Sequence, residues 1–221
     1  MKYVKMLGLA AVVAAALMAF AGSSTASATV LCSEPGTGSP TGTTCPAGKA
    51  YGAGVEIHAV SEGNLVLTTG SEFTGFTCRK STMKGFTNNE GSATETVTAS
   101  IEGKNLTWEE CSTPNGACTL TSVKGGELEI HWIEGSHNGT LTSIGAEITE
   151  SCASIFGKIH CIFVFADEDI GTVTGGNSAT IDIESTPVNL IATSGLCSKE
   201  PKLDAKYEIT TPKPFYVTGH T

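Results

Sequence analysis

The sequence predicts an all-β protein: one antiparallel β-sandwich or barrel-like domain, held by disulfides and preceded by a signal peptide. Three observations lead to this prediction. Apolar residues recur at every second position in most hydrophobic stretches, which is the period of a strand with one buried face. Turn signals rich in Gly and Asn separate these stretches. Eight cysteines supply an even set for disulfide bonds.

The first 28 residues have the organisation of a secretory signal peptide. Lys2 and Lys5 precede an apolar run over residues 6–21, and small residues end in Ala26-Ser27-Ala28. This order predicts cleavage after Ala28 and a secreted, extracellular protein. The apolar run is too short and too rich in small residues for a spanning helix, which needs about 20 strongly apolar residues.

The remaining residues, 29–221, are expected to form a single domain without a lipid or membrane anchor. Cys32 follows the cleavage site, but Leu31 stands where a lipid-attachment site needs a small residue. Loss of Lys2 and Lys5 leaves 11 basic and 22 acidic residues, a net charge of −11. This charge repels nucleic acid and anionic membrane surfaces, so we expect no nucleic-acid partner. We interpret the acidity as a solvated exterior that resists aggregation.

Three stretches alternate most clearly, and each predicts a strand with one buried face. The inward residues expected from stretches 93–101, 127–134 and 179–183 are Val97, Ala99, Ile101, Leu128, Ile130, Trp132, Ala179, Ile181 and Ile183. Further strand-like runs cover residues 55–60, 65–69, 105–109, 147–150, 188–193 and 206–211. Turn signals lie at residues 114–116, 124–126, 138–139 and 175–177.

Residues 161–166 are apolar at every position, which predicts a central strand covered on both sides. We take this strand as the middle of the core. Phe163 and Phe165 are expected to pack against Ile130 and Trp132.

Eight cysteines in an exported chain predict four disulfides and no free thiol. Two pairs would close hairpin tips and one would close a Pro/Gly-rich loop over residues 33–44. The expected pairs are Cys32 with Cys45, Cys78 with Cys197, Cys111 with Cys118, and Cys152 with Cys161. Cys78 with Cys111 stays open as an alternative, because both flank strands in the same part of the chain. The chain has no C-x-x-C motif, so we expect no metal site and no cofactor.

A search for catalytic motifs finds one short match. Ser81 and Lys84 fit the S-x-x-K pattern of penicillin-binding enzymes, in which both residues lie one turn apart on a helix. Here Gly85 follows directly and the surroundings are strand-like, so we interpret the match as chance.

Two polar clusters are candidate sites. Glu129 and His131 share the outward face of one predicted strand, and Glu134 and His137 follow in the next loop. They offer an acid–base pair or metal ligands, although the solvent-exposed face of an edge strand is the simpler interpretation.

The second cluster follows the strand at residues 161–166. Asp167, Glu168 and Asp169 are consecutive carboxylates that offer oxygen ligands to calcium, but their spacing is not that of an EF-hand. A solvated loop is favoured here as well.

The order of several landmarks resembles a known family. The landmarks are Leu31-Cys32, Cys45-Pro46, Tyr51-Gly52-Ala53-Gly54, Phe76-Thr77-Cys78, Ser81-Thr82, Lys84-Gly85 and the ending over residues 207–217. They resemble secreted, cysteine-containing proteins of unknown function that occur as many paralogues in soil actinobacteria. The resemblance implies an exported β-rich architecture and no particular activity.

Two classes of function fit the sequence. The first is a non-enzymatic extracellular module that binds a polymer or another protein, or has a structural role. The second is a small hydrolase with an acidic pair, for which Glu127, Glu129, Glu134 and the loop at Asp167 are the candidates. Convergence of an acidic pair with His131 in one concave pocket would favour the hydrolase.

Overall fold

The computed structural model describes residues 28–70, 74–92, 94–102, 105–114, 116, 118–154, 157–165, 168–192, 197 and 200–220. The signal-peptide prediction therefore lies outside the described residues, except for Ala28. The strands are β1 (Thr29–Cys32), β2 (Glu56–Ser61), β3 (Leu65–Thr68), β4 (Phe76–Thr87), β5 (Val97–Ser100), β6 (Leu106–Ser112), β7 (Cys118–Lys124), β8 (Glu127–Trp132), β9 (Gly139–Ile144), β10 (Ala146–Ser154), β11 (Gly157–Phe165), β12 (Glu168–Thr174), β13 (Thr180–Pro187), β14 (Asn189–Ala192), β15 (Lys202–Thr211) and β16 (Tyr216–Gly219). The predicted all-β fold is confirmed.

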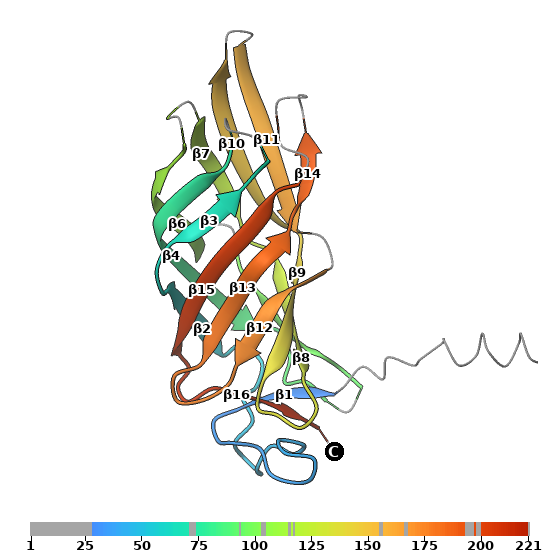
Figure 1. Ribbon diagram of the computed structural model, residues 1–221. Coiled ribbons are helices and arrows are strands. Elements are labelled where there is room, and N and C mark those ends of the chain that lie inside the picture. Colours follow the sequence, from blue (N-terminus) through green and yellow to red (C-terminus); the bar gives the residue numbers. More distant parts are fainter. Residues whose placement is uncertain are drawn as a thin grey trace, which may run out of the picture.

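The lower half of the molecule is a closed antiparallel barrel of eight strands (Figure 1). Strands β13, β12, β9, β8, β5, β4, β2 and β15 are hydrogen-bonded in this order. The ring closes because β13 also pairs with β15, with Ile181 opposite Tyr207. Closure removes the sheet edges that would otherwise offer unpaired backbone groups to another chain.

The upper half divides into two four-stranded sheets that face each other. We call β15, β3, β4 and β6 leaf A, and β14, β11, β10 and β7 leaf B. Among the described residues, no strand pairing joins β6 to β7 or β14 to β15, so two open seams separate the leaves. The molecule thus combines the two predicted alternatives, with a barrel below and a sandwich above.

Most of the short strands are halves of longer ones that run from the barrel into a leaf. Glu127 pairs with Ile144 in the barrel, and Lys124 pairs with Glu147 in leaf B, so one register continues through both halves. A Cβ on Gly126 would lie 2.2 Å from the Ile144 carbonyl oxygen, and Gly145 has φ +74°. The turn predicted at residues 124–126 is therefore wrong, since these glycines allow close backbone approach at a kink rather than a chain reversal.

The lower end of the barrel is covered by a small separate sheet. Strands β1 and β16 pair with each other and cross this end, with the loop of residues 33–50 below them (Figure 1). The Tyr51 hydroxyl donates to the Pro214 carbonyl oxygen at 2.5 Å, and fully buried Phe215 fills the barrel just inside. This end is consequently plugged by the chain's own residues.

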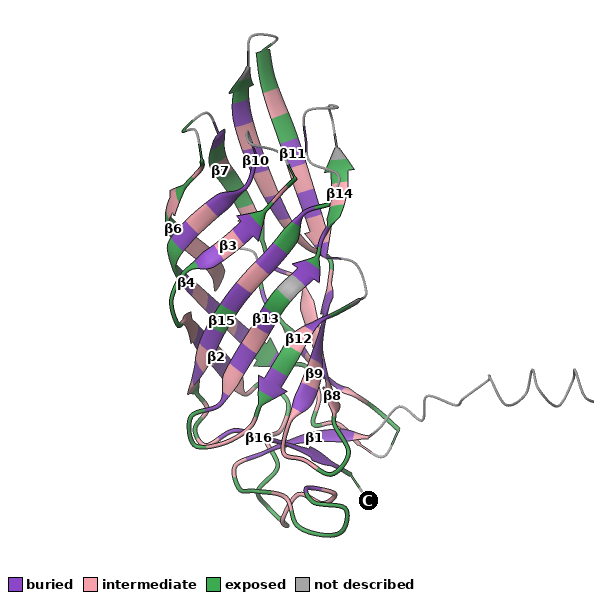
Figure 2. Ribbon diagram, in the orientation of Figure 1, coloured by how far each residue is buried: buried purple, intermediate pink, exposed green. Residues whose placement is uncertain are grey.

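The predicted strand phases are largely confirmed. Buried and more exposed residues alternate along the barrel strands (Figure 2). The buried residues among those predicted to face inward are Val97, Ala99, Ile101, Ile130, Ala179, Ile181 and Ile183, while Leu128 and Trp132 are half-buried.

The strand predicted to be covered on both sides has only one buried face. In β11, Phe163 and Phe165 point into the core, whereas Ile162 and Val164 are half-buried on the opposite face. The prediction was wrong because nothing in the sequence of an apolar strand tells whether a second layer covers its outer face.

The expected packing of Phe163 and Phe165 against Ile130 and Trp132 stays a prediction. Phe165 lies near Leu128, because both line one interior cavity. Trp132 lies at the lower end of the barrel, where a Cβ on Gly219 would come within 2.8 Å of its ring.

The disulfides are Cys32–Cys45, Cys78–Cys111, Cys118–Cys152 and Cys161–Cys197, and no cysteine is free. Cys32–Cys45 is confirmed. The predicted pair Cys78–Cys197 is wrong, and Cys78–Cys111 is the alternative that the sequence left open. Closure of hairpin tips by Cys111–Cys118 and Cys152–Cys161 is wrong.

Strand register explains the difference. Cys118 stands directly opposite Cys152 and Cys78 opposite Cys111, each with a Cα–Cα distance of 3.9 Å. Cys111 and Cys118 instead lie on β6 and β7, on either side of an open seam. For each of Cys111, Cys118 and Cys152, the nearest cysteine along the chain is therefore not the one that lies opposite it in the sheet.

Candidate functional site

The first predicted cluster lies on the outside of the barrel. Glu129 and His131 neighbour each other on the outer face of β8, with 3.4 Å between the Glu129 Oε2 and His131 Nε2 atoms. Glu134 is exposed in the following turn. His137 turns away and packs edge-on against Tyr216, with 5.7 Å between ring centroids. The four side chains do not converge in one pocket.

The other acidic candidates are also engaged separately. The Glu127 carboxylate accepts a hydrogen bond from the Asn88 side chain at 3.0 Å. Asp167 lies outside the described residues, while Asp169 is exposed and accepts a hydrogen bond from Thr142 at 2.7 Å.

The S-x-x-K match is divided between the two faces of β4. Ser81 points into the barrel and is 1% exposed. Lys84 points outward and forms an ion pair with Glu56 at 2.7 Å. Residues three apart on a strand project to opposite faces, so the serine and the lysine cannot act on the same atom.

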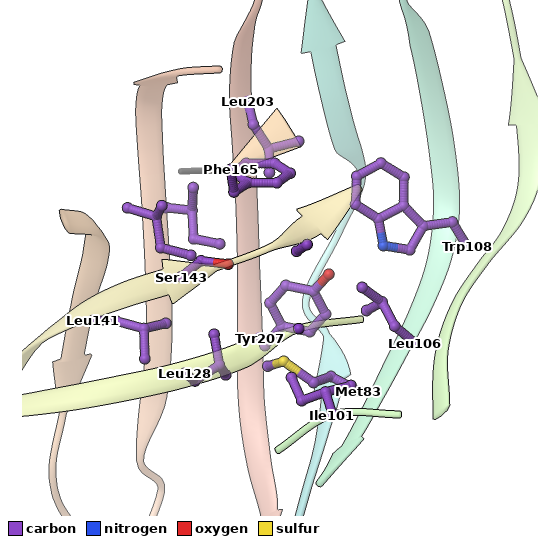
Figure 3. Close-up of a pocket in the computed structure, with 14 residues that line it drawn as sticks. Met83, Ile101, Leu106, Trp108, Leu128, Leu141, Ser143, Phe165, Leu203 and Tyr207 are labelled. Atoms are coloured by element: carbon purple, nitrogen blue, oxygen red, sulfur yellow. The ribbon is translucent and has the colours of Figure 1, made fainter. Parts of the chain in front are cut away.

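One feature suited to binding a small apolar molecule is an interior cavity where the barrel meets the leaves. Its volume is about 50 Å³, and its lining is mostly apolar. Met83, Leu128, Leu141, Phe165 and Leu203 enter it from strands all around the barrel (Figure 3). Below it, a smaller space of about 20 Å³ lies among the side chains that fill the lower barrel.

A few polar groups meet at this apolar cavity. Tyr207 is 3% exposed, and its hydroxyl forms a 2.9 Å hydrogen bond with the Ser81 hydroxyl. Burial raises the pKa of Tyr207 to about 12, and the hydrogen bond with the Ser81 hydroxyl and, to a lesser extent, the Trp108 indole N–H acting on the phenol oxygen offset part of this rise. The phenol is therefore neutral at physiological pH. Figure 3 shows the Ser143 hydroxyl pointing into the same space.

Trp108 contributes a hydrogen-bond donor that is not satisfied. Its indole ring packs on Phe76 at 5.3 Å between centroids, with a 57° tilt. The indole N–H faces the Tyr207 hydroxyl (Figure 3) and lowers the pKa of the phenol, but among the described residues Nε1 has no hydrogen bond of normal geometry. Buried N–H groups normally have a partner, so this donor is a notable exception.

A second unusual polar group lies between the leaves. Glu150, on the inner face of β10, is fully buried. Its Oε2 accepts a hydrogen bond from the backbone N–H of Gly75, next to leaf A, at 3.3 Å, and its Oε1 has no partner. Burial raises the pKa of this carboxyl to about 7, against the smaller opposing effect of the Gly75 hydrogen bond.

The described residues contain one cluster with the composition of a metal site, formed by Cys118, Glu150 and Cys152. Both sulfurs belong to the Cys118–Cys152 disulfide, so neither is the thiolate that a metal would need. The cluster as built does not fit a metal ion.

Sequence reasoning identified none of the four residues Ser81, Trp108, Glu150 and Tyr207 as parts of a site. Two signals were present. Trp108 does not belong to a clear alternation of buried and exposed positions. Glu150 occupies an inward position between Ile148 and Cys152. Their convergence depends on strand pairing that the sequence does not display.

Comparison of the chain with protein-family models, with curated proteins and with solved structures finds no match. The described residues contain no helix of the length and apolar character needed to cross a membrane. The geometry of the cavity is therefore the main basis for a functional argument.

Proposed function

We propose that the protein is a secreted, non-enzymatic binding module that holds a small, largely apolar molecule inside its barrel. The observation that carries the proposal is the interior cavity with a mostly apolar lining and a few convergent polar groups. Small-molecule sites commonly have this composition. Eight-stranded barrels have an interior just wide enough to be filled by side chains or to hold one small ligand.

The size of the cavity restricts its occupant. At about 50 Å³ it is smaller than the engineered cavity of about 150 Å³ that binds benzene in another protein. The occupant has only a few non-hydrogen atoms, or the leaves move apart to admit a larger one.

The construction of the leaves favours such movement. The open seams carry no strand pairing among the described residues, so separation of the leaves breaks no ladder of backbone hydrogen bonds. Cys78–Cys111 lies within leaf A, while Cys118–Cys152 and Cys161–Cys197 tie leaf B. Each leaf is covalently braced, and no disulfide links one leaf to the other.

Secretion and a non-enzymatic role are parts of this proposal. Four disulfides suit an oxidising compartment, in agreement with the predicted signal peptide. A hydrolase with an acidic pair would need two carboxylates facing one cavity, whereas Glu127 and Glu129 lie on the outer face of β8. A cavity of this small size favours a small molecule over the polymer or protein partner considered from the sequence.

The proposal is tested with xenon, a small apolar probe that enters dry protein cavities. Met83 lines both interior spaces and is the only methionine beyond residue 28. We expect its ¹³C-labelled methyl resonance to shift with xenon pressure in protein lacking the leader. Ser143→Leu should reduce the shift by filling the cavity, while Thr140→Leu on the outer face of the same strand should not. An unshifted Met83 resonance in folded protein would overturn the proposal.

A further inference from the structure

We infer that the ligand carries a neutral hydrogen-bond acceptor, of the carbonyl type, and that the Trp108 indole N–H donates to this acceptor inside the cavity. The inference rests on the proposed function and specifies its ligand. The class comprises small aliphatic aldehydes, ketones and esters, whose carbon chains suit the apolar lining and whose oxygen suits the donor.

The first argument is the unmet donor. An indole N–H can only donate, so neither protonation nor rotation can convert it into an acceptor. The Trp108 Nε1 is buried and makes no hydrogen bond of normal geometry to the described residues, although it lies close enough to the phenol of Tyr207 to lower the pKa of that phenol. An acceptor from the ligand supplies the well-aligned partner that the phenol does not.

The second argument is that this donor is held in place. Trp108 stands opposite Ser81 in the β4–β6 pairing, and its ring packs on buried Phe76. Ser81 in turn holds the Tyr207 hydroxyl at 2.9 Å. Both aromatic side chains are thereby oriented before a ligand arrives, which reduces the entropy lost on binding.

The third argument concerns charge. Among the described residues, those that line the cavity include no Lys, Arg, His, Asp or Glu, and the phenol of Tyr207 is neutral. A carboxylate or an ammonium group would lose its hydration there without gaining an opposite charge. The lining therefore favours a neutral acceptor over an ionic head group.

The experiment compares 2-pentanone with n-pentane, which has the same number of carbons and no acceptor. The chain has two tryptophans, so ¹⁵N-labelled protein gives two indole N–H signals. Trp132 Nε1 already donates to the Ser136 carbonyl oxygen at 2.8 Å and serves as the internal reference. We expect both compounds to shift the Met83 methyl signal. Only 2-pentanone should move the Trp108 N–H proton downfield, while Trp132 stays unchanged.

A matched variant measures the donor's contribution. Trp108→Phe should weaken 2-pentanone binding about tenfold, as expected for loss of one neutral hydrogen bond, and change n-pentane binding much less. n-Pentane thus controls for the packing change, and the wild-type indole signals remain informative if the variant does not fold.

The outcomes separate the two proposals. Equal Met83 shifts with both compounds and an unmoved Trp108 signal would overturn the acceptor inference and leave the apolar site standing. Unchanged 2-pentanone affinity in folded Trp108→Phe would also overturn it. No Met83 shift with either compound would overturn the acceptor inference, and the proposed function falls with it if xenon also leaves Met83 unshifted.

Discussion

Replacement of the buried Glu150 by glutamine should stabilise the protein at neutral and alkaline pH. The carboxyl lies on the inner face of leaf B, with one oxygen on the Gly75 N–H and the other without a partner. Glutamine has nearly the same shape, and its amide oxygen can accept the same hydrogen bond. It stays neutral at every pH, so Glu150→Gln removes only the cost of holding a charge in this position.

The magnitude follows from the pKa. Burial raises the pKa of Glu150 from 4.5 to about 7. Between these pH values the folded protein keeps a proton that the unfolded chain has lost, so raising the pH favours the unfolded chain. At 1.36 kcal/mol per pKa unit, the free energy of unfolding falls by about 3 kcal/mol across this interval and is then constant.

The assay is urea denaturation of wild type and Glu150→Gln at several pH values from 4 to 9, with the disulfides intact. The difference in the free energy of unfolding should be small below pH 4.5 and reach about 3 kcal/mol in favour of the variant above pH 7. Glu134→Gln, in an exposed turn, controls for removal of a negative charge. A difference that does not change with pH, or a wild type more stable at pH 8, would refute the reasoning.

Three further predictions concern the core, the disulfides and the mature chain. Phe163 is fully buried, so Phe163→Ala should lower the free energy of unfolding by about 3 to 5 kcal/mol, whereas Glu129→Ala on the outer face should change it little; equal denaturation midpoints would contradict this. Peptide mapping without reduction should recover Cys78 linked to Cys111, and a linkage of Cys111 to any other cysteine would be inconsistent with the structure. Replacing both cysteines by alanine should lower the free energy of unfolding by about 4 kcal/mol for a loop of this length. Intact-mass analysis of the exported protein should show a chain that begins at Thr29 without lipid; a retained leader or an added acyl mass would disprove it.

The sequence predicted the strands in which buried and exposed positions alternate without interruption. Stretches 93–101 and 179–183 keep one alternation throughout, and their inward residues are buried as expected. β4, the longest strand, was not predicted. Its buried positions shift phase at Arg79 and Lys80, which are both exposed, so neither half gives a long alternating signal.

Long-range pairing was the part that the sequence could not supply. Ser81 and Tyr207 are 126 residues apart and meet because β4 and β15 pair with opposite edges of β2. The disulfide prediction failed for a related reason. It ranked cysteine pairs by loop length, whereas the position opposite Cys152 across the sheet belongs to Cys118 and is set by register.

Two of the three buried polar atoms that lack a partner among the described residues, Trp108 Nε1 and Glu150 Oε1, gain a common explanation from the open seams. In a barrel closed along its whole length, a buried donor such as Trp108 Nε1 and a buried carboxyl such as Glu150 would only lower stability. Here they lie where the closed barrel gives way to leaves that no disulfide joins. Under the proposed function, the barrel fixes one wall of the site and the seams provide access. A ligand can satisfy the donor of Trp108, and a proton can neutralise the carboxyl of Glu150. Ligand binding at Trp108 should therefore raise the stability of the leaves relative to the barrel. Hydrogen exchange at the backbone amides of β6 and β10 would measure this effect, with the amides of β5 and β9 as the reference.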